Sequence, residues 1–318
     1  MNITRRDMLW QGAGAALLCV LPVSTRAAGL RVRTGPAFGS AWRLVMPETK
    51  EDPRPIIEAV VSRIDSRMSP YRRDSELARF NEGAAAALSA DTKAVADMAL
   101  TLARDSDGAF DPTTAPLGRR YGFGPLSISP AAPAGYYRDI RLEGSVLSKA
   151  KLGLTFELNA VAKGYALDEM TAALEGLDFV LELGGEVAAR GQHPSGRPWR
   201  FGIERPGSGK LQRLFDADKR VLATSGDGTQ NYRWDGRRYG HVIDPRTGAP
   251  VDNGVASVSV LAGSGLLADG LATAALVLGP DACRGLLASY NASALFLMQR
   301  NGGFEEVDVG GFVSGGPG

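Results

Sequence analysis

The spacing of apolar residues changes along the chain, and this change constrains the fold more than any other feature. A capping Asp and an early Pro precede apolar residues three and four apart, which predicts a helix from Asp52-Pro53 to Ser69-Pro70. The same spacing predicts helices at 75–81, 89–104, 160–174, 266–278 and 281–289. Alternating or continuous apolar stretches predict strands at 154–158, 179–183, 187–190, 200–203, 220–224, 238–243 and 255–261, and hairpins at 141–146 and at 294–298 with 304–309. Because helices gather early and strands late, we predict one compact α+β domain.

The N-terminus predicts an exported protein. Arg5 and Arg6 open the chain, a weakly apolar stretch covers 12–23, and Thr25-Arg26-Ala27 supplies the small residues of a cleavage site. The paired arginines resemble a twin-arginine signal. The apolar run is shorter than the roughly 20 residues of a spanning helix. We therefore predict a cleavable signal peptide at 1–27, a mature domain at 28–318 and a periplasmic location. A disordered or membrane-anchored N-terminus is the alternative.

The composition excludes several classes of function. A formal net charge of +1 leaves no basic face of the kind that nonspecific nucleic-acid binding needs. Two histidines, His193 and His241, are too few for a His-rich zinc site. After cleavage of the signal, Cys283 would be the one remaining cysteine, so no internal disulfide could form. The chain also has no Walker loop, no G-x-S-x-G motif and no Rossmann fingerprint.

Asp269 and Thr273 form a candidate metal site. They are four residues apart in the predicted helix 266–278 and therefore share one of its faces. Carboxylate and hydroxyl oxygens suit Mg²⁺, although backbone carbonyls, waters or phosphates would have to complete an octahedron. The alternative is that Asp269 only caps a helix.

Lys163 lies where a predicted strand passes into a predicted helix, in the segment 158–165. Amide groups at the start of a helix favour anions, and the lysine adds a positive charge that suits a phosphate. The alternative is an ordinary solvated lysine, since most lysines lie on the surface.

His241 precedes a strong turn signal, Asp244-Pro245-Arg246-Thr247-Gly248. Histidine accepts a proton near neutral pH, so it could act as general base for phosphoryl-type transfer to a hydroxyl. The alternative is a histidine that only braces the turn.

Three further segments contain features suited to a ligand or a turn. The segment 108–113 is a polar turn after a helix. Tyr71 could stack on an aromatic ligand or cover the edge of the core. Gly184-Gly185, between Glu182 and Glu186, permit either a close approach of backbone to a ligand or a bulge.

In their order along the chain, these motifs resemble the FAD:protein FMN transferase (ApbE) family. The resemblance covers about Phe38 to Val309 and implies a single α+β domain with N-terminal helices and a mainly antiparallel sheet. It depends on seven segments, at 68–71, 109–113, 162–168, 184–186, 223–227, 241–248 and 268–273.

The resemblance implies a Mg²⁺-dependent reaction in which FAD is split at its pyrophosphate. FMN would be joined through a phosphoester to a Thr or Ser hydroxyl of a partner protein, and AMP would leave. The implied partner is a flavin-acceptor protein of an exported or membrane electron-transfer chain.

The same resemblance implies roles for twelve residues. Asp269, Thr273 and the carbonyl of Ala160 would bind the metal, and His241 would be the base. The FAD site would be lined by Phe38, Tyr71, Ala109, Phe110, Asp111, Glu157, Lys163 and Ile243.

Four positions depart from the family pattern without removing this set. Phe38-Gly39-Ser40 stands where Met-Gly-Thr is usual, and Glu157 replaces an Asp. Ala272 stands where some members have a second carboxylate near the metal, and the segment 227–232 is longer than usual.

Two other functions remain open from the sequence. An FAD pyrophosphatase would use the same site with water in place of the acceptor hydroxyl. A flavin-binding carrier or maturation factor would bind without turnover, although the presence of Asp269, Thr273 and His241 favours an enzyme.

Overall fold

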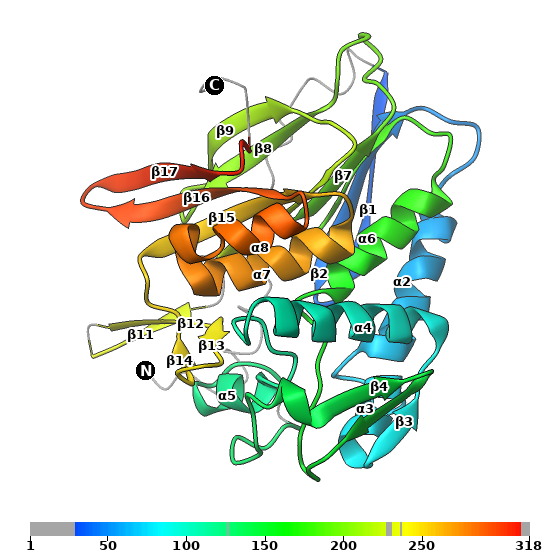
Figure 1. Cartoon of the computed structure of the whole chain (residues 1–318). Helices are drawn as coiled ribbons and strands as arrows, with labels where there is room; N and C mark the ends of the chain where they lie inside the picture. Colours follow the sequence, from blue (N-terminus) through cyan, green and yellow to red (C-terminus); the bar gives the residue numbers. More distant parts are fainter. Residues whose placement is uncertain (1–28, 126, 227–230, 236, 313–318) are drawn as a thin grey trace, which may run out of the picture.

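An eight-stranded sheet forms the centre of the computed structural model, which describes residues 29–125, 127–226, 231–235 and 237–312. Its strand order is β1-β2-β6-β7-β10-β15-β16-β17, and every neighbouring pair is antiparallel (Figure 1). The strands are β1 (Leu30–Ala37), β2 (Ser40–Pro47), β6 (Phe179–Leu183), β7 (Glu186–Arg190), β10 (Val221–Gly226), β15 (Val255–Ala262), β16 (Ser293–Arg300) and β17 (Gly303–Val309).

Both faces of this sheet are buried, each in its own core. Successive side chains of a strand point to opposite faces, so one strand contributes to both cores. Leu44 of β2 packs in the core beneath the helices, whereas its neighbour Val45 packs in a second core on the other face. That second face is covered by a two-stranded sheet of β8 (Arg200–Arg205) and β9 (Lys210–Asp216). The strand predicted at 255–261 is accordingly buried along its whole length.

A helical layer covers the first face. α7 packs on β10 and β15 and also contacts α6 and α4 (Figure 1). Small residues at many buried positions of α7 allow this close packing on both sheet and helices. The helices are α2 (Arg54–Met68), α3 (Glu76–Glu82), α4 (Ala90–Asp105), α5 (Ala115–Arg120), α6 (Ala162–Ala173), α7 (Gly265–Ala282) and α8 (Arg284–Ser289).

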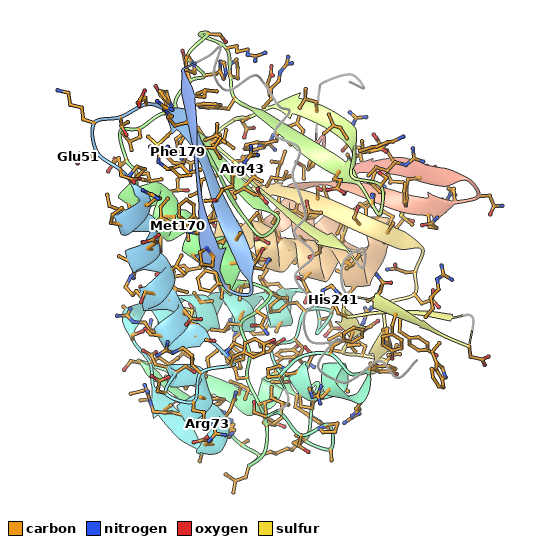
Figure 2. The ribbon with its side chains drawn as sticks, turned by 180° about the vertical axis from the view of Figure 1, so that it is seen from behind. Arg43, Glu51, Arg73, Met170, Phe179 and His241 are labelled. Atoms are coloured by element: carbon orange, nitrogen blue, oxygen red, sulfur yellow. The ribbon has the colours of Figure 1, made fainter. Side chains whose placement is uncertain are left out.

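A smaller layer lies on the far side of α4 from the large sheet (Figure 1). It contains α3, α5, a short 3-10 helix (Tyr137–Asp139) and the three-stranded sheet β3-β5-β4, made of Ala85–Ala87, Val146–Lys149 and Ile140–Glu143. Two small hairpins lie beside it, β11 (Asn231–Trp234) with β12 (Arg237–Gly240), and β13 (Ile243–Asp244) with β14 (Ala249–Pro250). Figure 2 shows His241 between the large sheet and the smaller layer, far from Arg73 at the lower edge.

The predicted strand at 154–158 is wrong. Within the described ranges this segment has no strand partner, although its apolar residues Leu154, Phe156 and Leu158 are buried. Phe156 instead exchanges two hydrogen bonds with the Asn81 side chain, at 2.7 and 3.1 Å, so an amide side chain takes the place of a neighbouring strand. An apolar run indicates burial but does not show whether a partner strand is available.

The single strand predicted at 238–243 is also wrong. The chain forms β12, leaves the strand conformation at His241 and Val242, and then starts β13. Because of this interruption, His241 lies between the two small hairpins.

The first hairpin, β1 with β2, precedes the early helices and forms one edge of the large sheet, and it was not predicted from the sequence. The hairpins predicted at 141–146 and around Asn301-Gly302 are confirmed. The two helices predicted at 266–278 and 281–289 are separated by a kink at Gly279, whose φ of 77° is not helical.

Among the described residues, α7 is the one helix long and apolar enough to cross a membrane. Most of it is buried against the sheet and the other helices, so it is the core helix of this domain. The predicted signal peptide at 1–27 lies outside the described residues.

Candidate active site

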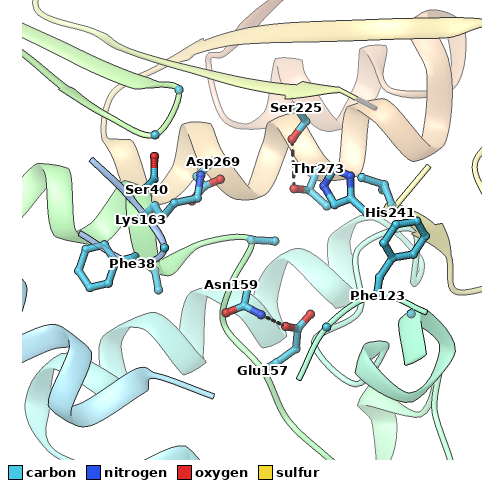
Figure 3. A pocket seen from close by; sticks show the side chains of 18 of the residues that line it. Phe38, Ser40, Phe123, Glu157, Asn159, Lys163, Ser225, His241, Asp269 and Thr273 are labelled. Carbon is cyan, nitrogen blue, oxygen red and sulfur yellow. Dashed lines mark hydrogen bonds between the residues drawn. The ribbon is translucent and has the colours of Figure 1, made fainter. Parts of the chain in front are cut away.

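A cavity of about 1080 Å³ opens between the large sheet, the N-terminal ends of α6 and α7, and the smaller layer (Figure 3). All twelve residues predicted for the site line it, although they come from distant parts of the chain. They are Phe38, Tyr71, Ala109, Phe110, Asp111, Glu157, Ala160, Lys163, His241, Ile243, Asp269 and Thr273.

The ends of α6 and α7 are held together by two carboxylates that each bind the other helix. Asp168 of α6 accepts the amide hydrogens of Gly265 and Leu266 at 2.6 and 2.9 Å. Asp269 of α7 accepts the amide hydrogen of Gly164 at 3.0 Å. Both contacts place negative charge at a positive helix end, which is favourable.

Glycine is required where these two helices touch. A Cβ on Gly164 would lie 2.0 Å from the carbonyl oxygen of Gly265, and a Cβ on Gly265 would lie 2.4 Å from that of Gly164. The absence of both side chains therefore lets the backbones approach closely and brings Asp269 to the start of α6.

Asp269 and Thr273 lie on one face of α7, and both line the cavity. Asp269 does not cap its own helix, because Ser264 does so by accepting from the amide of Leu267. Asp269 is 5% exposed, and burial raises its pKa. In the described part of the chain, its Oδ1 accepts no hydrogen bond. The Thr273 hydroxyl lies 3.4 Å from that of Ser225.

Lys163 is not an ordinary solvated lysine. Its Nζ donates to Glu186 Oε1 at 2.6 Å, and the Glu186 side chain is 1% exposed. Burial lowers the pKa of Lys163, but the negative charges of Glu186 and Asp269 outweigh this effect and raise it. Figure 3 shows the lysine beside Asp269, so a cation and a carboxylate face the cavity together.

Two tight turns carry further residues into the cavity. Phe38 and Gly39 join β1 to β2 with φ values of 50° and 72°, a conformation that is unusual for phenylalanine. Gly184 and Gly185 join β6 to β7 with φ values of 63° and 114°, so that Glu186 follows directly at the cavity wall.

The irregular segment at 154–158, where a strand was predicted, contains Glu157 and is followed by Ala160. Glu157 is anchored through its amide, which donates to the carbonyl of Pro112 at 2.8 Å. Burial raises the pKa of Glu157 to about 7, while the hydrogen bond from Asn159 opposes the shift. The carbonyl of Ala160 follows at the turn into α6.

Asp111 organises the loop after α4 through its carboxylate. It accepts from the amide and hydroxyl of Thr113 at 2.8 and 2.6 Å and from the amide of Tyr137 at 3.3 Å. Its carboxylate therefore shapes the loop, and Ala109 and the buried ring of Phe110 line the cavity from the same loop.

His241 lies between β12 and β13, and its ring meets that of Phe123 edge-on, with centroids 6.3 Å apart. The following turn is braced by Asp244, which accepts from the amide of Arg246 at 2.9 Å. Ile243 lines the cavity beside it. Tyr71 is 72% exposed at the rim, so it does not cover the core.

Sequence reasoning missed several residues of the cavity wall, above all Glu186, Ser225 and Phe123. Glu186 and Ser225 lie within motifs that the sequence analysis used, and their polar side chains next to glycines were a usable signal. Phe123 had none, because only the fold brings the segment after α5 next to His241. Among the described residues, no three His, Cys, Asp or Glu side chains cluster as metal ligands. The segment 227–232, which is longer than usual in the family, lies partly outside the described residues.

Residues 38–296 match the model of the ApbE family. The chain belongs to the ApbE family. The FAD:protein FMN transferase of Vibrio cholerae is 32% identical over 93% of this chain and 96% of its own length. The transferase of the same name from Haemophilus influenzae is 32% identical over 80% of this chain and 81% of its own length.

Solved structures agree with this membership. The flavin transferase ApbE from Vibrio cholerae matches with a TM-score of 0.78 at 31% identity, covering 89% of this chain and 98% of that chain. The apo form of the flavinyl transferase ApbE from Pseudomonas stutzeri matches with a TM-score of 0.76 at 31% identity, covering 88% and 94%. The predicted family and α+β fold are thus confirmed, and this ApbE protein is an enzyme of the transferase class.

Proposed function

We propose that this ApbE protein transfers FMN from FAD to a Thr or Ser hydroxyl of a partner protein, depends on Mg²⁺ and releases AMP. The observation that carries the proposal is the convergence of Lys163, Asp269 and Thr273 with His241 on one cavity. Its volume of about 1080 Å³ is at the upper end for ligand pockets and suits a dinucleotide as large as FAD.

The described residues fit a divalent cation. Asp269 offers a buried carboxylate whose Oδ1 accepts no hydrogen bond in the described part of the chain, and Thr273 offers a hydroxyl one turn later. The pair of Asp269 and Glu186 beside a single Lys163 leaves the cavity wall with an excess of negative charge. With the carbonyl of Ala160, these oxygens are the hard ligands that Mg²⁺ prefers. Bound Mg²⁺ would offset the negative charge of the pyrophosphate.

Other residues of the cavity would bind FAD and accept the proton of the acceptor hydroxyl. Lys163 presents positive charge to a phosphate, and Tyr71 and Phe38 offer ring faces for the flavin or adenine. His241 accepts the proton of the acceptor hydroxyl at a ring nitrogen. The hydroxyl oxygen then forms a bond to the FMN phosphorus. The bond from this phosphorus to the bridging oxygen breaks, and AMP leaves with the electron pair.

We further propose a periplasmic location, supported by the paired arginines and cleavage motif at the N-terminus. The acceptor would be a flavoprotein of an exported or membrane electron-transfer chain. Fractionation of cells that express the full chain tests this proposal. Retention of the protein in the cytoplasm would contradict it.

The decisive experiment mixes the protein, FAD, Mg²⁺ and a flavin-acceptor domain, with a chelator control. We expect the mass of FMN to be added to the acceptor and AMP to appear in equal amount, both only with Mg²⁺. AMP and free FMN without a modified acceptor would identify a pyrophosphatase. FAD that binds and is never cleaved would identify a carrier or maturation factor.

A further inference from the structure

Glu186 is a buried, charged residue of the cavity wall that the reaction described above does not use. It is 1% exposed, and burial together with the nearby charge of Asp269 raises its pKa despite the opposite charge of Lys163. Its Oε1 binds Lys163, whereas its buried Oε2 has no partner among the described residues. Burying a carboxylate oxygen without a donor is unfavourable, so stability alone does not explain this residue.

Lys163 also lies at a position that the helix disfavours. It is the second residue of α6, where the helix dipole repels a positive charge, and the first turn of α6 has no acidic residue. Nearby negative charge comes from outside the first turn, through Glu186 of β7 and Asp269 of α7. These two carboxylates keep the lysine charged at the cavity wall, where an ammonium suits an anionic ligand.

The turn between β6 and β7 fixes this pair in place. Gly184 and Gly185 both adopt positive φ, and a Cβ on Gly184 would lie 3.5 Å from the Cδ of Lys163 and 3.2 Å from the Ser40 hydroxyl. The turn thus packs against the stem of the lysine, and Glu186 binds its head. A free lysine side chain would lose rotamer freedom on binding a ligand.

We propose that Glu186 is a positioning residue of the reaction, which orders the Lys163 ammonium beside Asp269 so that it meets the pyrophosphate of FAD without reorganisation. The inference rests on the proposed transfer from FAD. Glu186 is expected to have opposite effects on anion affinity and on the rate of transfer. The carboxylate weakens anion binding through its charge, and it raises the rate by holding the lysine in place.

The test compares wild type with Glu186→Gln, Lys163→Met and the double variant. In Glu186→Gln we expect kcat for transfer to fall by about 10- to 100-fold, the range for removal of a supporting hydrogen-bond partner. In chelator, AMP and FAD should bind this variant equally well or several-fold more tightly, because one negative charge has been removed. In the Lys163→Met background, Glu186→Gln should change kcat by less than about threefold, because the two residues act as a unit.

Glu182→Gln is the matched control. Glu182 is a buried carboxylate on the other strand of the same hairpin, near Arg43, and it does not line the cavity. This control should keep the wild-type kcat. Thermal melting of every variant checks the fold, and Glu186→Asp supplies a second variant that keeps the charge but shortens the reach.

The proposal would be overturned by independent effects of the two single changes on kcat, or by weaker metal-free nucleotide binding in a folded Glu186→Gln. If wild type binds FAD but transfers nothing, the proposed function fails instead. In that case, the nucleotide affinities of wild type, the two single variants and the double variant still show whether the effects of Glu186 and Lys163 are coupled.

Discussion

The candidate site has a helix-built part and a loop-built part, and the two depend on the fold in different ways. The helix-built part consists of Lys163 on α6 with Asp269 and Thr273 on α7, where the two helix ends touch through glycine. The loop-built part consists of Tyr71 and His241, which lie between elements at or near the rim. Changes in the first part should therefore disturb core packing as well as chemistry, whereas changes in the second should alter chemistry with little loss of stability.

Asp269→Asn should have the largest effect. The amide has a similar shape but removes the charge that would hold Mg²⁺, so we expect kcat to fall by about 10³-fold or more, or about 4 kcal/mol. Transfer assays across a range of Mg²⁺ concentrations measure this loss. Asp281→Asn, which changes an exposed carboxylate of α7 beyond the kink at Gly279, is the control and should leave kcat unchanged. Near wild-type turnover in a folded Asp269→Asn would refute the metal assignment.

His241→Ala should lower kcat by about 10²- to 10³-fold, as expected for removal of a general base. Because the residue lies outside the core helices, the melting temperature should stay close to that of wild type. FAD affinity, measured by flavin fluorescence, should change little. His193 is the control histidine: it is buried beside Trp199 and does not line the cavity, so His193→Gln should cost stability but not turnover. Loss of FAD binding with unchanged turnover in His241→Ala would count against its role as base.

Gly164→Ala should mainly reduce stability. The added methyl group would lie 2.0 Å from a backbone oxygen of α7, so the helices must separate, at a cost of about 3 kcal/mol or more. Chemical denaturation measures this cost, and Mg²⁺-dependent activity should fall with it. Gly285→Ala is the control, because nothing lies within 4 Å of the added group. Equal stability of the two variants would show that the helix contact does not constrain the site.

Tyr71→Ala should have the smallest effect of this series. Loss of one ring face at the rim should weaken FAD binding by about fivefold, or about 1 kcal/mol, and Tyr71→Phe should restore it. Titration of flavin fluorescence measures both affinities. A loss in Tyr71→Ala that Tyr71→Phe fails to restore would indicate that the hydroxyl, and not the ring, contacts the ligand.

Local patterns in the sequence were sufficient for much of the site. The spacing of Asp269 and Thr273 placed both on one helix face, and a turn signal located the segment after His241. The order of the motifs identified the family. These features are readable because helix periodicity and turn chemistry depend on residues that are close in the chain.

Tertiary structure decided what depends on partners from elsewhere in the chain. Among the described residues, the apolar run 154–158 pairs with no strand, and the Asn81 side chain binds the backbone of Phe156 instead. No local pattern contains that information. The strand predicted through His241 is broken, so the histidine lies between two hairpins.

Long-range contacts also decided which partners the polar residues bind. Asp269 proved to bind the neighbouring helix and not to cap its own, and Lys163 proved to be paired with Glu186. A residue type and its spacing determine which contacts are possible. The partner that occupies each contact is set by long-range packing, because burial decides which charges and hydrogen-bonding groups must be satisfied together.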